Sequence, residues 1–227
     1  MGTALLRAIL TLSAPALRRV VALGLGLSGL AFVLIWTAAA ALLAHTALFG
    51  WRPLDWLVEL AGGLTVLVLS WLLFPAVVTM IIGFFLEPVA AAVEALHFPG
   101  RGPPRRQSIY ETLVPSVRLM LLTIVLNLLA LPLYLLLPGL NVFIFLGLNG
   151  YLFGREYFEI VALRRLNIGE VKTVRHRFSG RVFCGGVMIA GVFAVPLVNL
   201  IAPVIATAFM VHVFEELTAH QTRPVSG

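Results

Sequence analysis

The order of charged and apolar positions divides the chain into four long apolar segments. Each lacks Asp, Glu, Lys and Arg throughout, and each is longer than the roughly 20 residues that an α-helix needs to cross a bilayer. Together they hold 128 of the 227 residues, which leaves little chain for a soluble domain. The pattern therefore predicts an all-α integral membrane protein, with 1-227 as a single membrane domain. The four segments are 20 to 51, 60 to 86, 119 to 154 and 182 to 214.

The third segment is too long to cross the membrane once. Its 36 residues would extend about 54 Å as one helix, against a hydrocarbon core of about 30 Å. Turn-forming residues interrupt it near its middle, and the fourth segment repeats the device: Pro138, Gly139 and Asn141 in the third, Pro196 and Asn199 in the fourth. The sequence therefore predicts two helical hairpins, over 116-165 and 182-216. We favour hairpins that penetrate the bilayer only part way, and a six-span bundle is the alternative.

Basic residues indicate which loops face the cytoplasm. The loop 51-59 holds one basic residue beside two acidic ones, whereas basic residues gather in the N-terminal stretch and after the second span. Because cytoplasmic loops carry the excess of Lys and Arg, this loop should face outward and both termini should be cytoplasmic. The predicted order is an N-terminal interfacial helix (1-19), a first transmembrane helix (20-50), a second with its extension (60-96), and then the two hairpins.

Composition narrows the class of protein and partner. Hydrophobic residues make up 60% of the chain and charged residues 11%, whereas a soluble protein is about a quarter charged. The formal net charge of +6 fits a cytoplasmic face beside anionic lipids, and nucleic acid is not expected as a partner. Cys184 is the only cysteine and the five histidines show no helical ligand spacing, so neither a metal site nor a cofactor is predicted.

Three short motifs suggest chemistry, and each also has a structural interpretation. GLGLSG matches a dinucleotide-binding pattern but lies inside a predicted membrane helix, where Gly24 and Ser28 favour close helix packing. REYFE offers two carboxylates to an enzyme, although an ion pair between Arg155 and Glu159 explains it more simply. EVKTVRHRFSGR, residues 170 to 181, indicates a helix on anionic headgroups or, alternatively, a vestibule that attracts soluble anions.

The stretch PALRR, which opens the first long helix, has the features of an anion site. Pro15 suits the first helical position, which leaves the backbone N–H groups of Ala16, Leu17 and Arg18 without intrahelical partners. Arg18 and Arg19 oppose the helix dipole at this end, at a cost of about 0.3 to 1 kcal/mol each. A bound sulfate or phosphate would resolve the conflict. The alternative is that the two arginines anchor the helix on lipid phosphates at the cytoplasmic side.

These features together resemble the CysZ sulfate permeases and the wider etoposide-induced 2.4 homology superfamily. The resemblance lies in PALRRVVALGLGLS, FFLEPVAAAVEAL, LLLPGLN and VPLVNLIAPVIATAF, in that order along most of the chain. It implies two long transmembrane helices, two hemi-penetrating hairpins, and sulfate uptake through the bacterial inner membrane for cysteine synthesis. It also implies a sulfate site at Ala16, Leu17, Arg18 and Arg19, with Ala16 standing where the family often has glycine.

The leading hypothesis is an inner-membrane transporter of a small oxyanion, with sulfate as the first candidate, that works as a homo-oligomer. The apolar segments hold few polar side chains, and Asn141 and Asn199, near the hairpin tips, are candidates for lining a pore. A non-transporting scaffold or lipid-shaping protein is the alternative, in which the arginine pair would govern lipid association. An enzyme comes third, because no nucleophile, histidine base or metal ligand set accompanies REYFE.

Overall fold

The computed structural model describes residues 1–44 and 52–219, which form helices and connecting turns with no strand among them. Four of the described helices are long and apolar enough to cross a membrane, which confirms the predicted all-α membrane class. The chain divides into two compact units, Arg18–Phe85 and Met1–Leu17 together with Leu86–Gly227. The candidate spans are Pro15–Ala41, Leu60–Gly83, Ile109–Leu136 and Ala202–Ala219.

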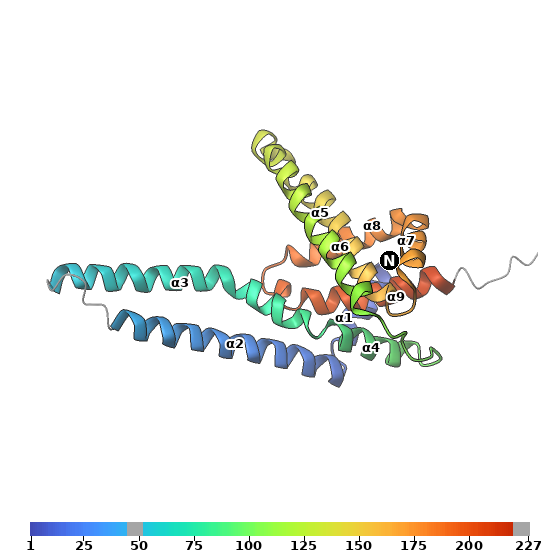
Figure 1. Ribbon diagram of the computed structural model, residues 1–227, viewed down its shortest axis with the longest axis horizontal. Helices are drawn as coiled ribbons and strands as arrows, with labels where there is room; N and C mark the ends of the chain where they lie inside the picture. The colour runs from blue at the N-terminus through green and yellow to red at the C-terminus, as the bar shows by residue number, and fades with distance from the viewer. Residues whose placement is uncertain (45–51, 220–227) are drawn as a thin grey trace, which may run out of the picture. The chain divides into compact units, whose positions relative to one another are not determined.

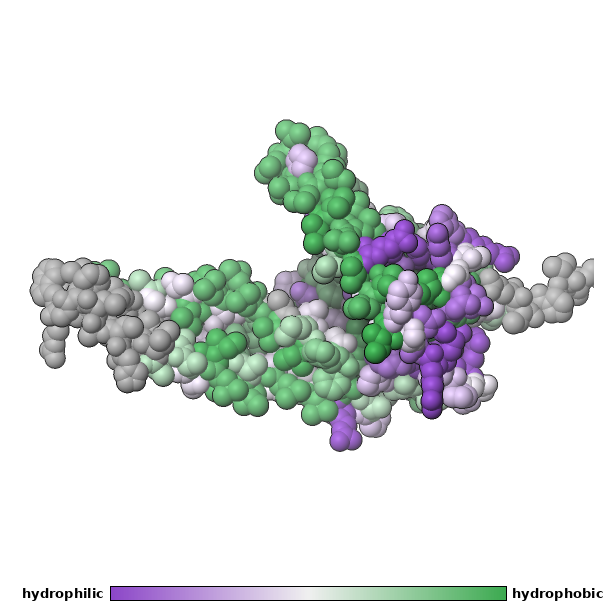
Figure 2. Space-filling model, viewed as in Figure 1, coloured by the Kyte–Doolittle hydropathy of each residue, from purple (hydrophilic) through white to green (hydrophobic). Residues whose placement is uncertain are grey.

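The unit Arg18–Phe85 contains most of α2 (Pro15–Ala44) together with α3 (Arg52–Gly83) (Figure 1). The described side chains on its surface are largely apolar, and Leu30 and Leu64 are 57% and 61% exposed. Figure 2 shows this surface as predominantly hydrophobic. Helices with apolar side chains on every side are suited to lipid, because exposing so much apolar surface to water would be unfavourable.

Within this unit α2 and α3 pack closely at a glycine. A Cβ at Gly24 would lie 2.7 Å from Cγ1 of Ile82, so the absence of a side chain at Gly24 lets α3 approach. Ser28, one turn later, is fully buried and donates its hydroxyl to the carbonyl of Gly24 at 2.7 Å. The rings of Phe32 and Phe74 continue the contact at a centroid distance of 5.2 Å. The packing role predicted for Gly24 and Ser28 is confirmed.

The first predicted hairpin consists of α5 (Ile109–Leu136), a short 3₁₀ turn (Pro138–Leu140) and α6 (Asn141–Ala162). The turn falls at the proline and glycine that the sequence pointed to. At its other end α5 begins with a capping box, in which Ser108 accepts from the N–H of Glu111 and Glu111 accepts from the N–H of Ser108.

The second hairpin is preceded by a short amphipathic helix. The order is α7 (Ile168–Arg177), α8 (Ser179–Phe193), a 3₁₀ turn (Val198–Leu200) and α9 (Ala202–Ala219). The stretch expected as one helix over 170 to 181 is therefore broken at Phe178. Leu197, just after Pro196 in the turn, has a positive φ of 65°, which is unusual for a residue with a side chain.

Helix α9 is the centre of the larger unit and packs against α1 (Gly2–Thr11), α4 (Leu86–His97), α6 and α8. Nearly all of its side chains are buried, although its composition would allow it to span a membrane. One face of α1, with Ala4 and Ala8, is buried, whereas Leu6 and Leu10 on the other are about 60% exposed. This outward apolar face suits the interface expected of the N-terminal segment.

Two of the predicted segments each comprise more than one helix in the structure. Within the expected interfacial helix 1-19, α1 ends at Thr11 and α2 begins only at Pro15, because a residue before proline disfavours helical backbone. Within the expected second span and extension 60-96, α3 ends at Gly83. A turn at Phe84 and Phe85 then separates it from α4.

Helix α6 crosses α8 with almost no side chain between the two backbones. A Cβ at Gly186 would collide with the carbonyl oxygen of Gly150, and one at Gly154 would lie 2.5 Å from the carbonyl oxygen of Val182. Gly150 and Gly154 are four residues apart, which is the small-residue spacing typical of close helix crossings in membranes. This crossing fixes the position of the residues that follow Gly154 on α6.

Candidate functional site

The predicted anion site at the start of α2 keeps two free backbone donors. Since Pro15 is the first helical residue, the N–H groups of Ala16 and Leu17 have no acceptor within the helix. By helix geometry the N–H of Arg18 is the first that can reach a carbonyl at the helix start, that of Ala14, so the donors counted as free are those of Ala16 and Leu17. The backbone contribution to this site is therefore limited to two N–H groups.

The two arginines of this site are both available to an anion. Arg18 and Arg19 are exposed, and neither has a side-chain hydrogen bond or ion pair within the described part of the chain. Leu17, in contrast, is only 1% exposed. An anion would therefore meet the guanidinium groups and the side of the helix start on which Ala16 is exposed.

The two asparagines lie at the tips of their hairpins, as predicted. Asn141 begins α6, and its side-chain amide lies within hydrogen-bonding distance of the carbonyls of Tyr134 and Leu137, at 3.1 and 3.2 Å. These bonds satisfy carbonyls at the end of α5, so the side chain stabilises the turn. Asn199 lies in the second turn, where its backbone N–H donates to Val195 at 3.0 Å. A role of either residue in lining a pore stays a prediction.

A second cluster of cations surrounds two neighbouring cavities at α6 and α7. One cavity, of about 270 Å³, is bordered by α5, α6 and α7, and the other, of about 370 Å³, by α6, α7 and the start of α8. We call them together the basic cavities. Both are lined by Tyr151, Arg155, Arg175 and His176, while Arg118 and Lys172 line the first only.

Positive charge exceeds negative charge around the basic cavities. Four cations line them, with Glu159 as the one carboxylate among the lining residues. Arg155 donates from Nε to Glu159 at 2.9 Å, and Nε of Arg175 lies 3.6 Å from the same oxygen. The ion pair predicted for REYFE is thus confirmed. Arg155 and Arg175 have side chains only 10% and 19% exposed, so this charge is largely shielded from water.

Helix α7 turns its apolar face toward protein. Val171 and Val174 are buried, at 3% and 7% exposed, and the helix packs against α6 and α8. A capping box at Asn167 and Glu170 fixes its start. Figure 2 shows hydrophilic residues gathered around α7 and the loop after α4, while the α5–α6 hairpin is hydrophobic toward its tip. The basic stretch therefore lies at the polar end of the larger unit.

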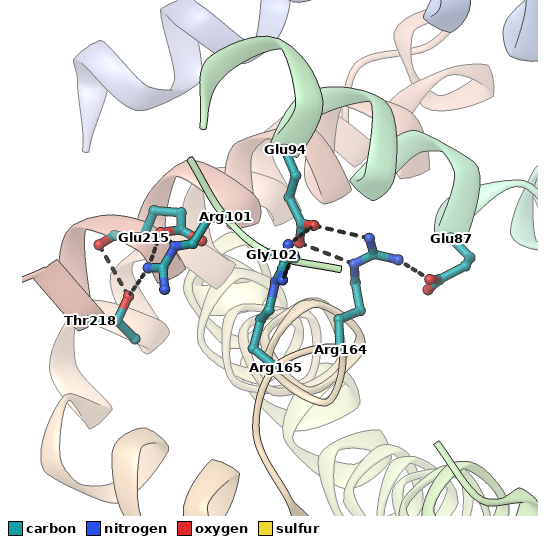
Figure 3. A network of polar contacts seen from close by, with 8 residues as sticks. All are labelled: Glu87, Glu94, Arg101, Gly102, Arg164, Arg165, Glu215 and Thr218. Atoms are coloured by element: carbon teal, nitrogen blue, oxygen red, sulfur yellow. Dashed lines mark hydrogen bonds and ion pairs between the residues drawn. The ribbon is translucent and has the colours of Figure 1, made fainter. Parts of the chain in front are cut away.

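A separate network of ion pairs joins α4 to the end of α6 (Figure 3). Arg164, with 1% of its side chain exposed, contacts Glu94 through Nε at 3.1 Å and Nη2 at 3.0 Å, and also contacts Glu87. Arg165 contacts the same Glu94 and donates to the carbonyl of Gly102. Burial raises the pKa of the Glu94 carboxyl, whereas the hydrogen bond from Arg165 lowers it. Burial is the larger effect, so the pKa of Glu94 stays above its ordinary value, and the hydrogen bond and charge of Arg165 offset part of the shift.

The network continues to α9 through the loop after α4. Arg101 pairs with Glu215 on α9 and donates to the hydroxyl of Thr218 at 3.2 Å (Figure 3). In the same loop, the N–H of Arg105 donates to the carbonyl of Arg164 at 2.9 Å. The loop 98–107 is thereby held between α6 and α9, and a cavity of about 380 Å³ lies against the same network.

Family comparison decides the class of this protein. Residues 4–203 match the family model described as Sulfate transporter CysZ/Etoposide-induced protein 2.4. The chain belongs to this family. Neither a curated protein nor a solved structure matched the chain. Together with the four candidate spans, membership in the CysZ/etoposide-induced protein 2.4 family identifies a membrane protein.

The match to the CysZ/etoposide-induced protein 2.4 family covers both groups of cations, the start of α2 and the basic cavities. From the sequence, the stretch 170 to 181, which contains Arg175, was expected on anionic headgroups or in a vestibule for soluble anions, and Arg118 and Arg155 were not placed beside it. The available signal was the glycine pair at 150 and 154 on α6, because close packing against Gly186 places Arg155 beside the start of α8.

Proposed function

We propose that this protein carries a small oxyanion, with sulfate as the first candidate, across the bacterial inner membrane. The observation that carries the proposal is the start of α2, where exposed Arg18 and Arg19 follow a helix end with two free N–H groups. Guanidinium groups and helix N-termini both favour tetrahedral oxyanions. Membership in a family whose name refers to sulfate transport supports the same substrate class.

In this proposal Arg18 and Arg19 capture the anion by electrostatic attraction, and the N–H groups of Ala16 and Leu17 bind its oxygens. The four residues then act before the anion enters the membrane. We further propose that the protein is a homo-oligomer with both termini cytoplasmic, that its hairpins penetrate only part of the bilayer, and that its transport supplies sulfate for cysteine synthesis. No step of this process calls for enzymatic chemistry or a cofactor.

The experiment is radiolabelled sulfate uptake into liposomes that contain the purified protein at matched levels. The test variant is Arg18→Ala with Arg19→Ala. The matched control is Arg7→Ala with Arg106→Ala, which removes two exposed arginines from elsewhere in the chain. We expect uptake by wild type and by the control, and loss of uptake in the test variant.

Two results would contradict the proposal in different ways. If liposomes with the wild-type protein take up sulfate no faster than empty liposomes, the proposal that this protein alone transports sulfate is contradicted. Equal loss of uptake in the test and control variants would show that total charge matters and the position of the arginines does not. If the test variant instead loses association with anionic liposomes while no flux occurs in wild type, the scaffold or lipid-shaping function is favoured.

A further inference from the structure

The basic cavities bring together cations from three helices. Cations in the last turn of α7, where Arg175 lies, are common because they complement the helix dipole. Arg118 on α5 and Arg155 on α6 have no such reason to lie beside them, and their positions result from the packing of three helices. Arg155 and Arg175, with side chains 10% and 19% exposed, repel one another, and Glu159 offsets part of this repulsion, whereas Arg118 and Lys172 are exposed.

Most hydrogen-bond donors of the two central arginines are unused. A guanidinium has five N–H donors, yet among the described residues Arg155 makes one side-chain hydrogen bond, from Nε to Glu159. Nε of Arg175 is buried and has no hydrogen-bond acceptor. A largely buried donor without an acceptor costs free energy. The described residues supply no hydrogen-bond acceptor for this donor, so an acceptor from a bound ligand would stabilise the site.

The start of α8 adds neutral donors to the same place. Ser179 and Gly180 line the second cavity, and as the first two residues of a 15-residue helix they have N–H groups without intrahelical acceptors. Phe178, the residue before them, makes no side-chain cap. The hydroxyls of Tyr151 and Ser179 complete a set of donors that is fitted to an acceptor with several oxygens.

We propose that the basic cavities bind a tetrahedral oxyanion, a sulfate or phosphate group, between Arg155 and Arg175. The two guanidinium groups contribute paired hydrogen bonds, Lys172 and Arg118 contribute charge, and the start of α8 contributes backbone donors. The volumes, about 270 and 370 Å³, are small for ligand pockets and suit an inorganic ion or a single headgroup phosphate. A role of this site as a second binding site along the transport path rests on the proposed function. Binding of the oxyanion to the cavities does not depend on that function.

Binding is measured separately from flux, by titration calorimetry of sodium sulfate into the full-length protein in phosphatidylcholine nanodiscs at constant ionic strength. The test variant is Arg155→Gln with Arg175→Gln. The matched control is Arg177→Gln, which removes an α7 cation that is not among the cavity-lining residues. We expect the test variant to bind sulfate about tenfold more weakly or worse, because it loses charge-assisted hydrogen bonds, and the control to bind as wild type does.

A second variant separates loss of the site from loss of the fold. Glu159→Gln removes the one lining carboxylate, so sulfate should bind more tightly than in wild type, an outcome that misfolding would not produce. Sulfate binding that is unchanged in Arg155→Gln with Arg175→Gln, or weakened in a folded Glu159→Gln variant, would overturn the proposal. Because Arg18 and Arg19 are themselves a proposed sulfate site, all of these titrations are made in an Arg18→Ala, Arg19→Ala background, so that the heat measured comes from the basic cavities.

A lipid arm identifies the natural source of the oxyanion. In nanodiscs that contain phosphatidylglycerol, a headgroup phosphate that occupies the cavities would weaken sulfate binding to wild type. If phosphatidylglycerol leaves the sulfate affinity unchanged, the site is assigned to the free ion. Sulfate binding without uptake in liposomes would refute transport and leave this site standing. Uptake that persists with no sulfate binding at Arg155 and Arg175 would support transport and refute this second site.

Discussion

Replacing Glu94 with alanine removes the carboxylate that faces both Arg164 and Arg165. The side chains of Glu94 and Arg164 are only 6% and 1% exposed. Without Glu94, the guanidinium of Arg164 would keep Glu87, whose side chain is 61% exposed, and would lose its contacts at 3.0 and 3.1 Å. A largely buried cation would then lack its bidentate partner.

The expected loss of stability follows from this burial. Breaking a buried ion pair from one side typically costs about 3 to 5 kcal/mol, because the remaining charge stays buried, and here the Arg164 charge would keep only the largely exposed Glu87. For a chain of this size, 1 kcal/mol corresponds to about 2 to 4 °C in Tm, so Glu94→Ala should lower Tm by about 6 to 20 °C. The double variant Glu94→Leu with Arg164→Met should be more stable than Glu94→Ala, because it removes both buried charges.

The choice of assay follows from where the reporter groups lie. The four tryptophans fall between residues 36 and 71, away in sequence from the network, so tryptophan emission would not follow its unfolding. Circular dichroism of the helices in detergent, with size-exclusion chromatography after heating, reports on the whole chain. Glu216→Ala is the control, because this exposed glutamate on α9 has no ion pair within the described residues. A Tm for Glu94→Ala within about 2 °C of the control would refute the reasoning about buried charge.

Three further substitutions test the packing and the helix starts. Gly186→Ala should hinder the close approach to Gly150 and lower Tm, whereas Gly191→Ala, where a Cβ meets no neighbour, should melt as wild type does. Ser108→Ala removes the cap of α5 and should cost about 1 kcal/mol, or about 2 to 4 °C in Tm; no shift would show that the cap is not needed. Gly24→Ala should cost less than Gly186→Ala, because its Cβ meets a side chain that can move rather than backbone, and the reverse order of Tm values would contradict this distinction.

The fold could be predicted where a single physical rule applied along the chain. Charge-free length against bilayer thickness predicted the membrane class, and the turns occur where proline stands near other turn formers, at Pro138 and Pro196, whereas Pro115 and Pro132 lie inside α5. The start of α2 at Pro15 was predicted, whereas the turn at Phe84 and Phe85 and the end of α1 at Thr11 were not. The turn at Phe84 and Phe85 lies in an uninterrupted apolar run, in which hydrophobic periodicity changes little when a helix ends and another begins.

The two candidate sites differ in how far each could be predicted from the sequence. The start of α2 is local, so Pro15 and the arginines after it could be interpreted from five consecutive residues. The basic cavities combine Arg118, Arg155 and Arg175, which are up to 57 positions apart in the sequence. Their approach depends on helix crossing, which composition and charge do not encode.

Helix α6 connects the packing of the larger unit to its charge. Gly150 and Gly154 set its distance from α8, Arg155 follows immediately at the basic cavities, and Arg164 lies just past its end in the buried network. A bulky residue at position 186 would push α6 away and so displace Arg155 from Arg175, without removing any charge. Loss of sulfate binding in a folded variant of Gly186 that keeps all cations would therefore show that the position of the cations, rather than their number, determines anion binding.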